Sequence, residues 1–217
     1  MGTVEIFSAE VCPYAHRTRL VLMQKGVDFS LTEIDLSNKP EWFTEVSPYG
    51  KVPSIRHDGR IIYESSIINE YLDEVFPEPP LLPTSPYERA MARIWMDYGN
   101  TRFNVASFKM LRENDGANQN ALRTELDACL KFMEEGMAKL SDGPYWLGTE
   151  PSLVDYSYYP FFERFCNVEH YRDYQIPGSC MRLLAWRDAM KALPVVRQIA
   201  NAPEFYIERA KAYAQPS

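Results

Sequence analysis

Hydrophobic and polar positions alternate at the start of the chain and then change to a helical spacing. Residues 3–8, T-V-E-I-F-S, predict a strand, and the apolar positions that follow Pro13 predict a helix that ends at Gly26. Alternation returns at 29–34 and predicts a second strand. A strand, a helix and a strand within about 35 residues are typical of a parallel unit with a right-handed crossover.

The next segment predicts a short helix and a hairpin. Residues 40–46 suit a short helix, and the pair Asp58-Gly59 separates two short strands at 54–57 and 60–63. An Asp-Gly pair is a strong signal for a two-residue hairpin turn. The apolar residues of 64–76 then recur on one helical face, with Ser65 as the expected N-cap.

A proline-dense segment, P-E-P-P-L-L-P-T-S-P, separates this front part from a remainder in which only helical patterns occur. Because proline fixes φ and removes a backbone donor, the segment cannot be regular structure. The sequence thus predicts a first domain at 1–77, a linker at 78–86 and an all-helical domain at 87–217. Helices are expected there at 87–111, 117–140, 152–165, 179–192 and 204–213, with a short turn from Val195. Ser152 and Asp155 make a variant capping box.

Composition and charge exclude several partners. Of 217 residues, 46% are hydrophobic, and no apolar run approaches the length of about 18 that a membrane span needs. The start of the chain shows no signal-like segment, so we expect a cytoplasmic protein. A formal net charge of −7 argues against nucleic acid as a partner, because such binding depends on clustered Lys and Arg.

Of the four cysteines, only Cys12 has a context that favours reactivity. It precedes Pro13 at the start of the first helix, where Cys12 is the expected N-cap and the amides of Tyr14 and Ala15 are expected to point at its sulfur. Cys129 lies on an apolar helical stripe and is expected in the core. Neither the cysteines nor the histidines have ligand-like spacing, so no metal site is expected.

A Cys12 thiolate needs more stabilisation than a helix dipole gives. Lowering the pKa of a thiol from about 8.5 to about 6 takes roughly 3.4 kcal/mol, whereas the dipole supplies about 0.3 to 1 kcal/mol, or up to about 2 when partly buried. We therefore expect hydrogen bonds from the first turn, with a contribution from Arg17 and Arg19. Because Ala15 stands where dithiol oxidoreductases have a second cysteine, an external thiol must resolve a mixed disulfide on Cys12.

Several short motifs accompany this order of elements. They are C-P-Y-A at 12–15, N-K-P-E-W-F at 38–43, V-P at 52–53, Y-E-S-S-I at 63–67, E-Y-L-D-E at 70–74, and L-L-P followed by P-Y-E. Together they resemble the omega class of the glutathione transferase superfamily, with lambda-class proteins and bacterial glutathione lyases as near neighbours. The resemblance implies an α/β thioredoxin-like N-terminal domain with a mixed four-stranded sheet, followed by an all-α C-terminal domain. It also implies glutathione as co-substrate and a homodimer.

The resemblance assigns roles to particular residues of the first domain. Cys12 matches the catalytic cysteine that forms a mixed disulfide with glutathione. Val52 matches the residue whose backbone pairs with the cysteinyl part of glutathione, and Pro53 matches a cis-proline. Glu64 and Ser65 match the pair that holds the γ-glutamyl end.

Further residues are expected at the edges of the site. By resemblance, Lys39 lies near the glycyl end of glutathione, Lys51 is a candidate for the same carboxylate, and Tyr14 forms an aromatic wall. In such transferases the C-terminal helix helps to cover the acceptor side. The final helix carries Tyr206, Arg209 and Tyr213 at spacings that share one face, so these three are expected at the acceptor pocket.

Three functions remain open at this point. The leading hypothesis is a glutathione-dependent thiol transferase or reductase that uses Cys12 and acts on small disulfides, dehydroascorbate or glutathionyl ketones. The second is a bacterial-type glutathione lyase or etherase with a different acceptor. The third is a non-enzymatic interaction protein similar to the stringent-starvation proteins, which share this fold.

Overall fold

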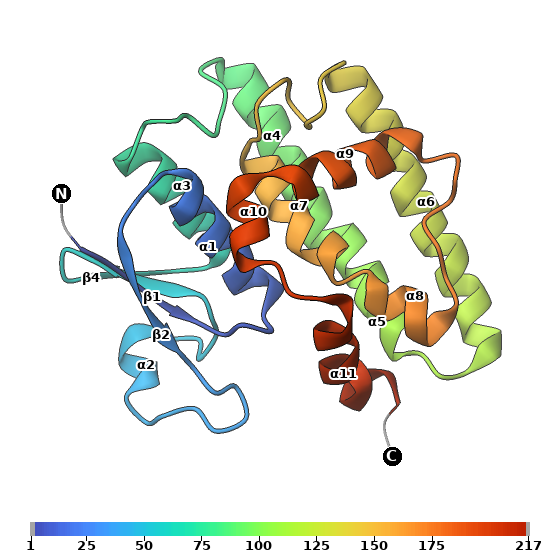
Figure 1. Cartoon of the computed structure of the whole chain (residues 1–217), viewed down its shortest axis with the longest axis horizontal. Helices are drawn as coiled ribbons and strands as arrows, with labels where there is room; N and C mark the ends of the chain where they lie inside the picture. Colours follow the sequence, from blue (N-terminus) through green and yellow to red (C-terminus); the bar gives the residue numbers. More distant parts are fainter. Residues whose placement is uncertain (1–2, 216–217) are drawn as a thin grey trace. The chain divides into compact units, whose positions relative to one another are not determined.

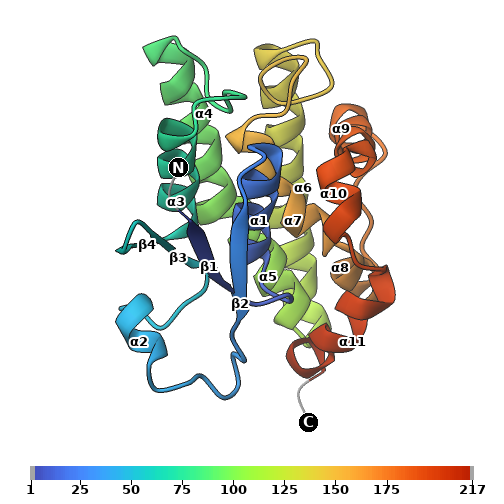
Figure 2. The ribbon, with the colours of Figure 1, turned by 60° about the vertical axis from the view of Figure 1, so that its left-hand side comes forward.

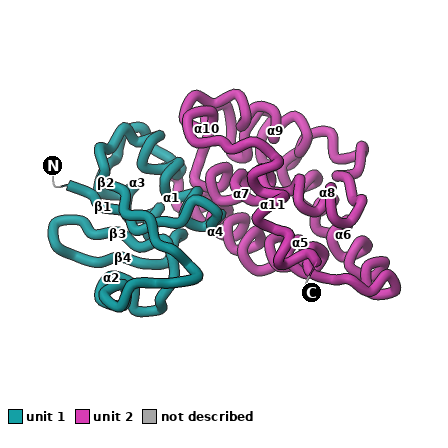
Figure 3. Tube along the Cα trace, turned by 60° about the horizontal axis from the view of Figure 1, so that its bottom comes forward, with its two compact units in different colours: residues 1–84 teal, residues 85–217 magenta. Residues whose placement is uncertain are grey.

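The computed structural model of the protein describes residues 3–215, and it divides the chain into two units, Met1–Thr84 and Ser85–Ser217 (Figure 3). The division falls inside the proline-dense segment predicted as the linker at 78–86. Among the described residues, no helix is long and apolar enough to cross a membrane.

Over its described residues, the first unit is a four-stranded mixed sheet with three helices (Figure 1). The strands lie in the order β2-β1-β3-β4, with β1 parallel to β2 and antiparallel to β3. The elements are β1 (Val4–Ser8), α1 (Pro13–Gln24), β2 (Phe29–Glu33), α2 (Phe43–Val46), β3 (Ser54–His57), β4 (Arg60–Tyr63) and α3 (Ser65–Val75). The predicted parallel unit and hairpin are confirmed.

The hairpin between β3 and β4 shows why its turn could be recognised. Asp58 has φ 49° and Gly59 has φ 76°, the two positive values that a type I′ turn requires. By contrast, the predicted helix at 40–46 is shorter than expected, because only Phe43–Val46 is helical.

Helices α1 and α3 pack against each other, whereas α2 lies apart from both (Figure 2). A buried ion pair supports this packing: Nζ of Lys25, at the end of α1, donates to the carboxylate of Asp73 on α3. The same ammonium group donates to the carbonyl oxygen of Pro79 over 2.6 Å, and the amide of Leu81 donates to Asp73 over 2.8 Å. These contacts also fasten the proline-dense segment to the first unit.

The second unit is all-helical over its described part. Its elements are α4 (Pro86–Tyr98), the π-helical turn η1 (Gly99–Phe103), α5 (Asn104–Arg112), α6 (Gly116–Leu140), α7 (Leu153–Glu163), α8 (Cys166–Arg172), α9 (Met181–Ala192), α10 (Pro194–Ile199) and α11 (Pro203–Ala214). The apolar stripe of α6 is buried as expected, Cys129 included. This all-helical half confirms the predicted fold class.

Two predicted helices differ from the structure. The one at 87–111 is interrupted by η1, where the hydroxyl of Tyr158 donates to the carbonyl oxygen of Trp95 over 2.6 Å. The ring of Tyr158 would lie 2.9 Å from a Cβ at position 99, so it fits only against Gly99. A side chain that binds a helical carbonyl is an established cause of such a distortion. The helix at 152–165 ends at Glu163, and the separate helix α8 was not predicted.

The buried carboxylate of Asp155 connects three segments of the second unit. It accepts hydrogen bonds from the amide and hydroxyl of Ser152, over 2.8 and 2.6 Å, which confirms the capping box. It also accepts from the amide of Trp146 over 3.0 Å and from the indole nitrogen of Trp186 over 2.7 Å. Two donors therefore meet each carboxylate oxygen.

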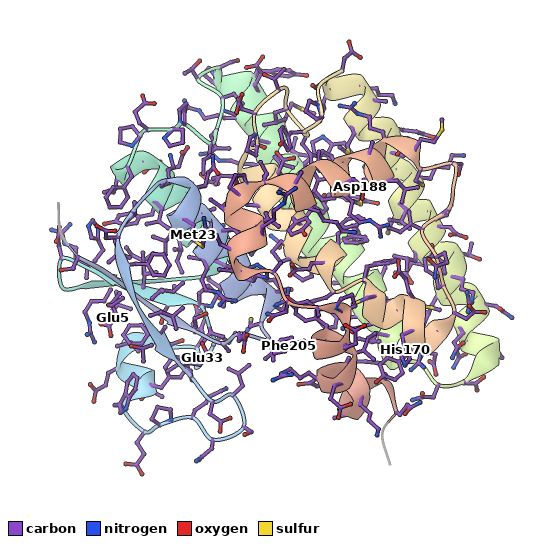
Figure 4. The ribbon with its side chains drawn as sticks, in the orientation of Figure 1. Glu5, Met23, Glu33, His170, Asp188 and Phe205 are labelled. Carbon is purple, nitrogen blue, oxygen red and sulfur yellow. The ribbon has the colours of Figure 1, made fainter. Side chains whose placement is uncertain are left out.

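We predict that Asp155→Asn lowers the free energy of unfolding by about 2 to 4 kcal/mol, because the amide NH₂ would face two hydrogen donors. Urea denaturation measures the change. Asp188→Asn is the matched control, since Asp188 is exposed on α9 (Figure 4) and should change the value by less than about 0.5 kcal/mol. Equal effects of both substitutions would contradict the role given to Asp155.

Candidate active site

Cys12 lies between β1 and α1, in a loop that backbone contacts hold in place. Its amide donates to the carbonyl oxygen of Ala9 over 2.9 Å. The amide of Glu10 donates to the carboxylate of Glu33, at the end of β2, over 2.5 Å (Figure 4). Cys12 has extended dihedral angles, φ −82° and ψ 117°, and is the N-cap of α1, with Pro13 as the first helical residue. The predicted position of the cysteine at a helix start is thus confirmed.

The side chain of Cys12 is half-buried and packs against an apolar cluster that includes Phe43, Val46 and Val52. Its Sγ lies 3.8 Å from the carbonyl oxygen of Val52, in the position of a thiol that donates a weak hydrogen bond. The sulfur is directed at Val52 instead of capping α1, so the expected bonds from the amides of Tyr14 and Ala15 do not describe this geometry. A neutral thiol donates its hydrogen, whereas capping requires the sulfur to accept.

The Val52-Pro53 peptide bond is cis, as the resemblance implied. Val52 is buried at the edge of the segment that leads into β3, and its carbonyl oxygen faces Cys12. The segment before it is held by Ser47, whose hydroxyl donates to the carbonyl oxygen of Lys51 over 2.6 Å. These contacts place a backbone edge beside the thiol.

The start of α3 differs from the prediction that Ser65 is its N-cap. Ser65 is the first helical residue, and Glu64 takes the N-cap position with φ 68° and ψ 107°. A non-glycine residue in this region is strained by of order 1 to 3 kcal/mol, and such strain concentrates at functional sites. The hydroxyl oxygen of Ser65 accepts hydrogen bonds from α1.

The donor of those bonds is Arg17, whose side chain is buried in the first unit. Its Nε donates to Oγ of Ser65 over 2.9 Å, and its Nη2 donates to the same atom over 2.5 Å and to Oγ of Ser66 over 3.1 Å. The guanidinium also lies over the ring of Tyr14, 5.1 Å from its centroid. Arg17 therefore joins the helix that begins after Cys12 to the helix that begins after Glu64.

Burial lowers the pKa of Arg17 to about 10, against the attraction of Tyr14, Cys12 and Glu64 in their ionised forms. The guanidinium thus remains protonated at neutral pH. The attraction is mutual, so the same cation favours a thiolate at Cys12. The electrostatic contribution expected from Arg17 therefore has a structural basis.

The other predicted contacts of the first unit are polar and mostly exposed. Lys39 is exposed, and its Nζ donates to the carbonyl oxygen of Gly50 over 2.9 Å. Lys51 is exposed, and its amide donates to Oγ of Ser47 over 2.9 Å. Tyr14 is half-buried under the Arg17 guanidinium. Each of these three residues lies in the first unit.

The three residues expected at an acceptor pocket do not share one environment on α11. Tyr206 is 4% exposed, its hydroxyl donates to Glu163 over 2.6 Å, and the Arg164 guanidinium lies 4.3 Å from its ring centroid. Tyr206 therefore packs within the second unit, and its expected place at an acceptor pocket stays a prediction. Arg209 and Tyr213 are exposed. Tyr206 is buried because α11 packs against α8 near the end of α7.

The remaining cysteines have unreactive surroundings. Burial raises the pKa of Cys166 to about 11, and it also raises the pKa of Cys180. Cys129 is buried on α6. Within residues 3–215, no three His, Cys, Asp or Glu side chains are grouped so that they could hold a metal ion.

Sequence reasoning treated Arg17 only as a source of positive charge and missed its contact with Ser65. A signal was present: Arg17 is three positions from Tyr14, so both lie on one face of the helix that begins after Cys12. What could not be read from the spacing was that α3 covers this face.

Two family models match the chain. The model described as glutathione S-transferase, N-terminal domain, matches residues 11–75, and the one described as glutathione S-transferase, C-terminal domain, matches residues 110–198. The matched ranges lie in the first and second units respectively.

Relatives and solved structures point the same way. Glutathione S-transferase omega-1 of Mus musculus is 34% identical over 219 residues, which cover 100% of this chain and 88% of that protein. Glutathione transferase Omega 3C of Trametes versicolor aligns with TM-score 0.87 and 26% identity, over 97% of this chain and 89% of that one. Rice GST1, solved in complex with glutathione, aligns with TM-score 0.90 and 28% identity, over 99% and 97%.

We predict that Cys12 reacts with iodoacetamide at lower pH than the other cysteines, because the thiolate is the reactive form. Half of the maximal labelling rate of Cys12 should be reached below the value of about 8.5 typical of a free thiol. Cys166 serves as the internal control, since labelling there should rise only toward pH of about 11. Peptide mass spectrometry against pH measures both, and a Cys12 midpoint at or above about 8.5 would contradict the activation.

Proposed function

Because the chain belongs to the glutathione S-transferase family, we propose that it is an omega-like thiol transferase in which Cys12 is the nucleophile and glutathione the co-substrate. The position of a cysteine at the N-cap of α1 carries this proposal. A thiolate can form a mixed disulfide with glutathione, and a helix start with a nearby guanidinium favours the thiolate.

The proposed reaction has two thiol–disulfide exchange steps. In the first, the Cys12 thiolate attacks the glutathionyl sulfur of a mixed disulfide, forms a Cys12–glutathione disulfide and releases the substrate as a thiolate, which takes up a proton. In the second, the thiolate of a free glutathione attacks the glutathionyl sulfur of that intermediate. Glutathione disulfide leaves, and the Cys12 thiolate is regenerated.

Residues of the first unit would hold glutathione during both steps. Ser65 and Glu64, at the start of α3, would bind the carboxylate and the ammonium group of the γ-glutamyl end. The backbone of Val52 would pair with the cysteinyl part, and Lys39 or Lys51 would meet the glycyl carboxylate. The proximity of Val52 to Sγ of Cys12, 3.8 Å from carbonyl oxygen to sulfur, supports this arrangement.

We predict that Cys12→Ala reduces thiol transfer from a glutathionylated peptide to background and changes the free energy of unfolding by less than about 1 kcal/mol. Cys12→Ser should still bind glutathione but not transfer it, because a hydroxyl cannot form the mixed disulfide. Cys166→Ala is the control and should keep full activity. Wild-type transfer by Cys12→Ala would refute the nucleophile, whereas activity on an aryl ether alone would assign an etherase.

We further propose that Arg209 and Tyr213, exposed on α11, contact the acceptor. Tyr213→Ala or Arg209→Met should then raise the acceptor KM about 5-fold, the effect of one lost contact, with little change in the KM for glutathione. Tyr206→Phe is the matched comparison: it removes only the bond to Glu163 and should lower stability without changing either KM. Equal changes for both substrates would contradict an acceptor role.

A further inference from the structure

The contacts of the Ser65 hydroxyl leave it able to donate one further hydrogen bond but not to accept one. A serine hydroxyl offers one hydrogen and two acceptor lone pairs. Nε and Nη2 of Arg17 donate to Oγ of Ser65 over 2.9 and 2.5 Å, so both acceptor positions receive hydrogens from one guanidinium. Ser65 can therefore bind a further group only by donating its hydrogen.

Arg17 and Ser65 cannot exchange the roles of donor and acceptor. A guanidinium has five donors and no acceptor, so Arg17 cannot take the hydrogen of Ser65 in return. Its orientation is also fixed, because Nη2 donates to Ser66 over 3.1 Å and the side chain is 3% exposed. With a pKa of about 10, Arg17 keeps its charge at neutral pH.

We propose that Arg17 is a specificity-determining residue: by occupying both acceptor positions of Ser65, it makes this hydroxyl a dedicated donor that selects a carboxylate. The inference rests on the proposed binding of the γ-glutamyl end at the start of α3. An ionised carboxylate accepts at both oxygens and carries a full negative charge, whereas a carboxamide accepts at one atom only and its NH₂ is a donor, and an ammonium group has no acceptor for the hydrogen of Ser65.

Two further features fit a carboxylate at this place. The first is the N-terminus of α3, an 11-residue helix whose dipole and first-turn amides favour negative charge. The second is the buried guanidinium of Arg17, which donates to Oγ of Ser65. The buried guanidinium behind the hydroxyl adds attraction for an anion and makes the hydroxyl a stronger donor.

The test compares two peptides on the Cys12→Ser variant, which separates binding from chemistry. One is S-methylglutathione, and the other is the same peptide with its γ-glutamyl α-carboxylate converted to a carboxamide. Titration calorimetry should show about 10- to 100-fold tighter binding of the carboxylate form, because a hydrogen bond to a charged group is the stronger kind. Equal affinities, or binding of neither peptide, would overturn the inference.

Substitution of Arg17 then tests which residue produces the preference. Arg17→Met should reduce it to about 3-fold or less, and Arg17→Gln should do the same, because the glutamine oxygen can take the Ser65 hydrogen. If Arg17→Met does not fold, Arg17→Gln carries the test. Arg17→Lys should restore part of the preference, since one ammonium group can fill an acceptor position.

The control is Arg56→Met, also in the first unit. Arg56 forms an ion pair with Glu5 over 2.8 Å (Figure 4). Its guanidinium also lies 5.4 Å from the ring centroid of Phe7, so Arg56, like Arg17, has polar and ring contacts within the first unit. It should keep the full preference. A purely structural role of Arg17 would weaken both peptides equally, and an unchanged ratio in its variants would overturn the proposal.

The result of this binding test can be told apart from the result of the test of the proposed function. If the unsubstituted chain transfers thiols but the Cys12→Ser variant binds both peptides equally, this inference alone is overturned. A clear carboxylate preference that depends on Arg17 would support it even if no transfer by Cys12 were found.

Discussion

The burial of one guanidinium, that of Arg17, is the constraint on which the organisation of the first unit depends. A buried charge is costly unless hydrogen bonds satisfy it, and Arg17 donates to two hydroxyls at the start of α3. Farther along the same two helices, the hydroxyl of Thr18 donates to the side-chain oxygen of Asn69 over 2.9 Å, and Lys25 forms an ion pair with Asp73. Helix α1 is thereby fixed to α3 along its length.

The contacts between α1 and α3 fix the positions of the two helix starts. Cys12 precedes α1, Glu64 and Ser65 begin α3, and the carbonyl oxygen of Val52 faces the thiol. The strained backbone of Glu64 is tolerated because the surrounding contacts determine it. A nucleophile is therefore held in the same unit as groups suited to the polar end of a peptide. This arrangement supports the proposed exchange at the sulfur of Cys12.

Much of the fold could be predicted because its signals are local. The Asp58-Gly59 turn, the break at Pro77 and the Ser152 capping box each depend on a few adjacent residues. The interruption of the helix at Gly99 could not be predicted, since it arises from Tyr158, far away in the sequence. The helix starts followed the same rule. The position of Cys12 before α1 could be predicted from its neighbours, whereas the contacts of Ser65 with Arg17 and of Tyr206 with Glu163 could not, because these residues meet only in the folded chain.

The central claim is that Cys12 carries glutathione as a mixed disulfide. Intact-mass and peptide mass spectrometry after brief exposure to glutathione disulfide tests it most directly. The account predicts one glutathionyl adduct, located on Cys12 and removed by added reduced glutathione. An adduct on Cys166 with Cys12 unmodified, or no adduct on Cys12 at any pH at which the protein is folded, would contradict it.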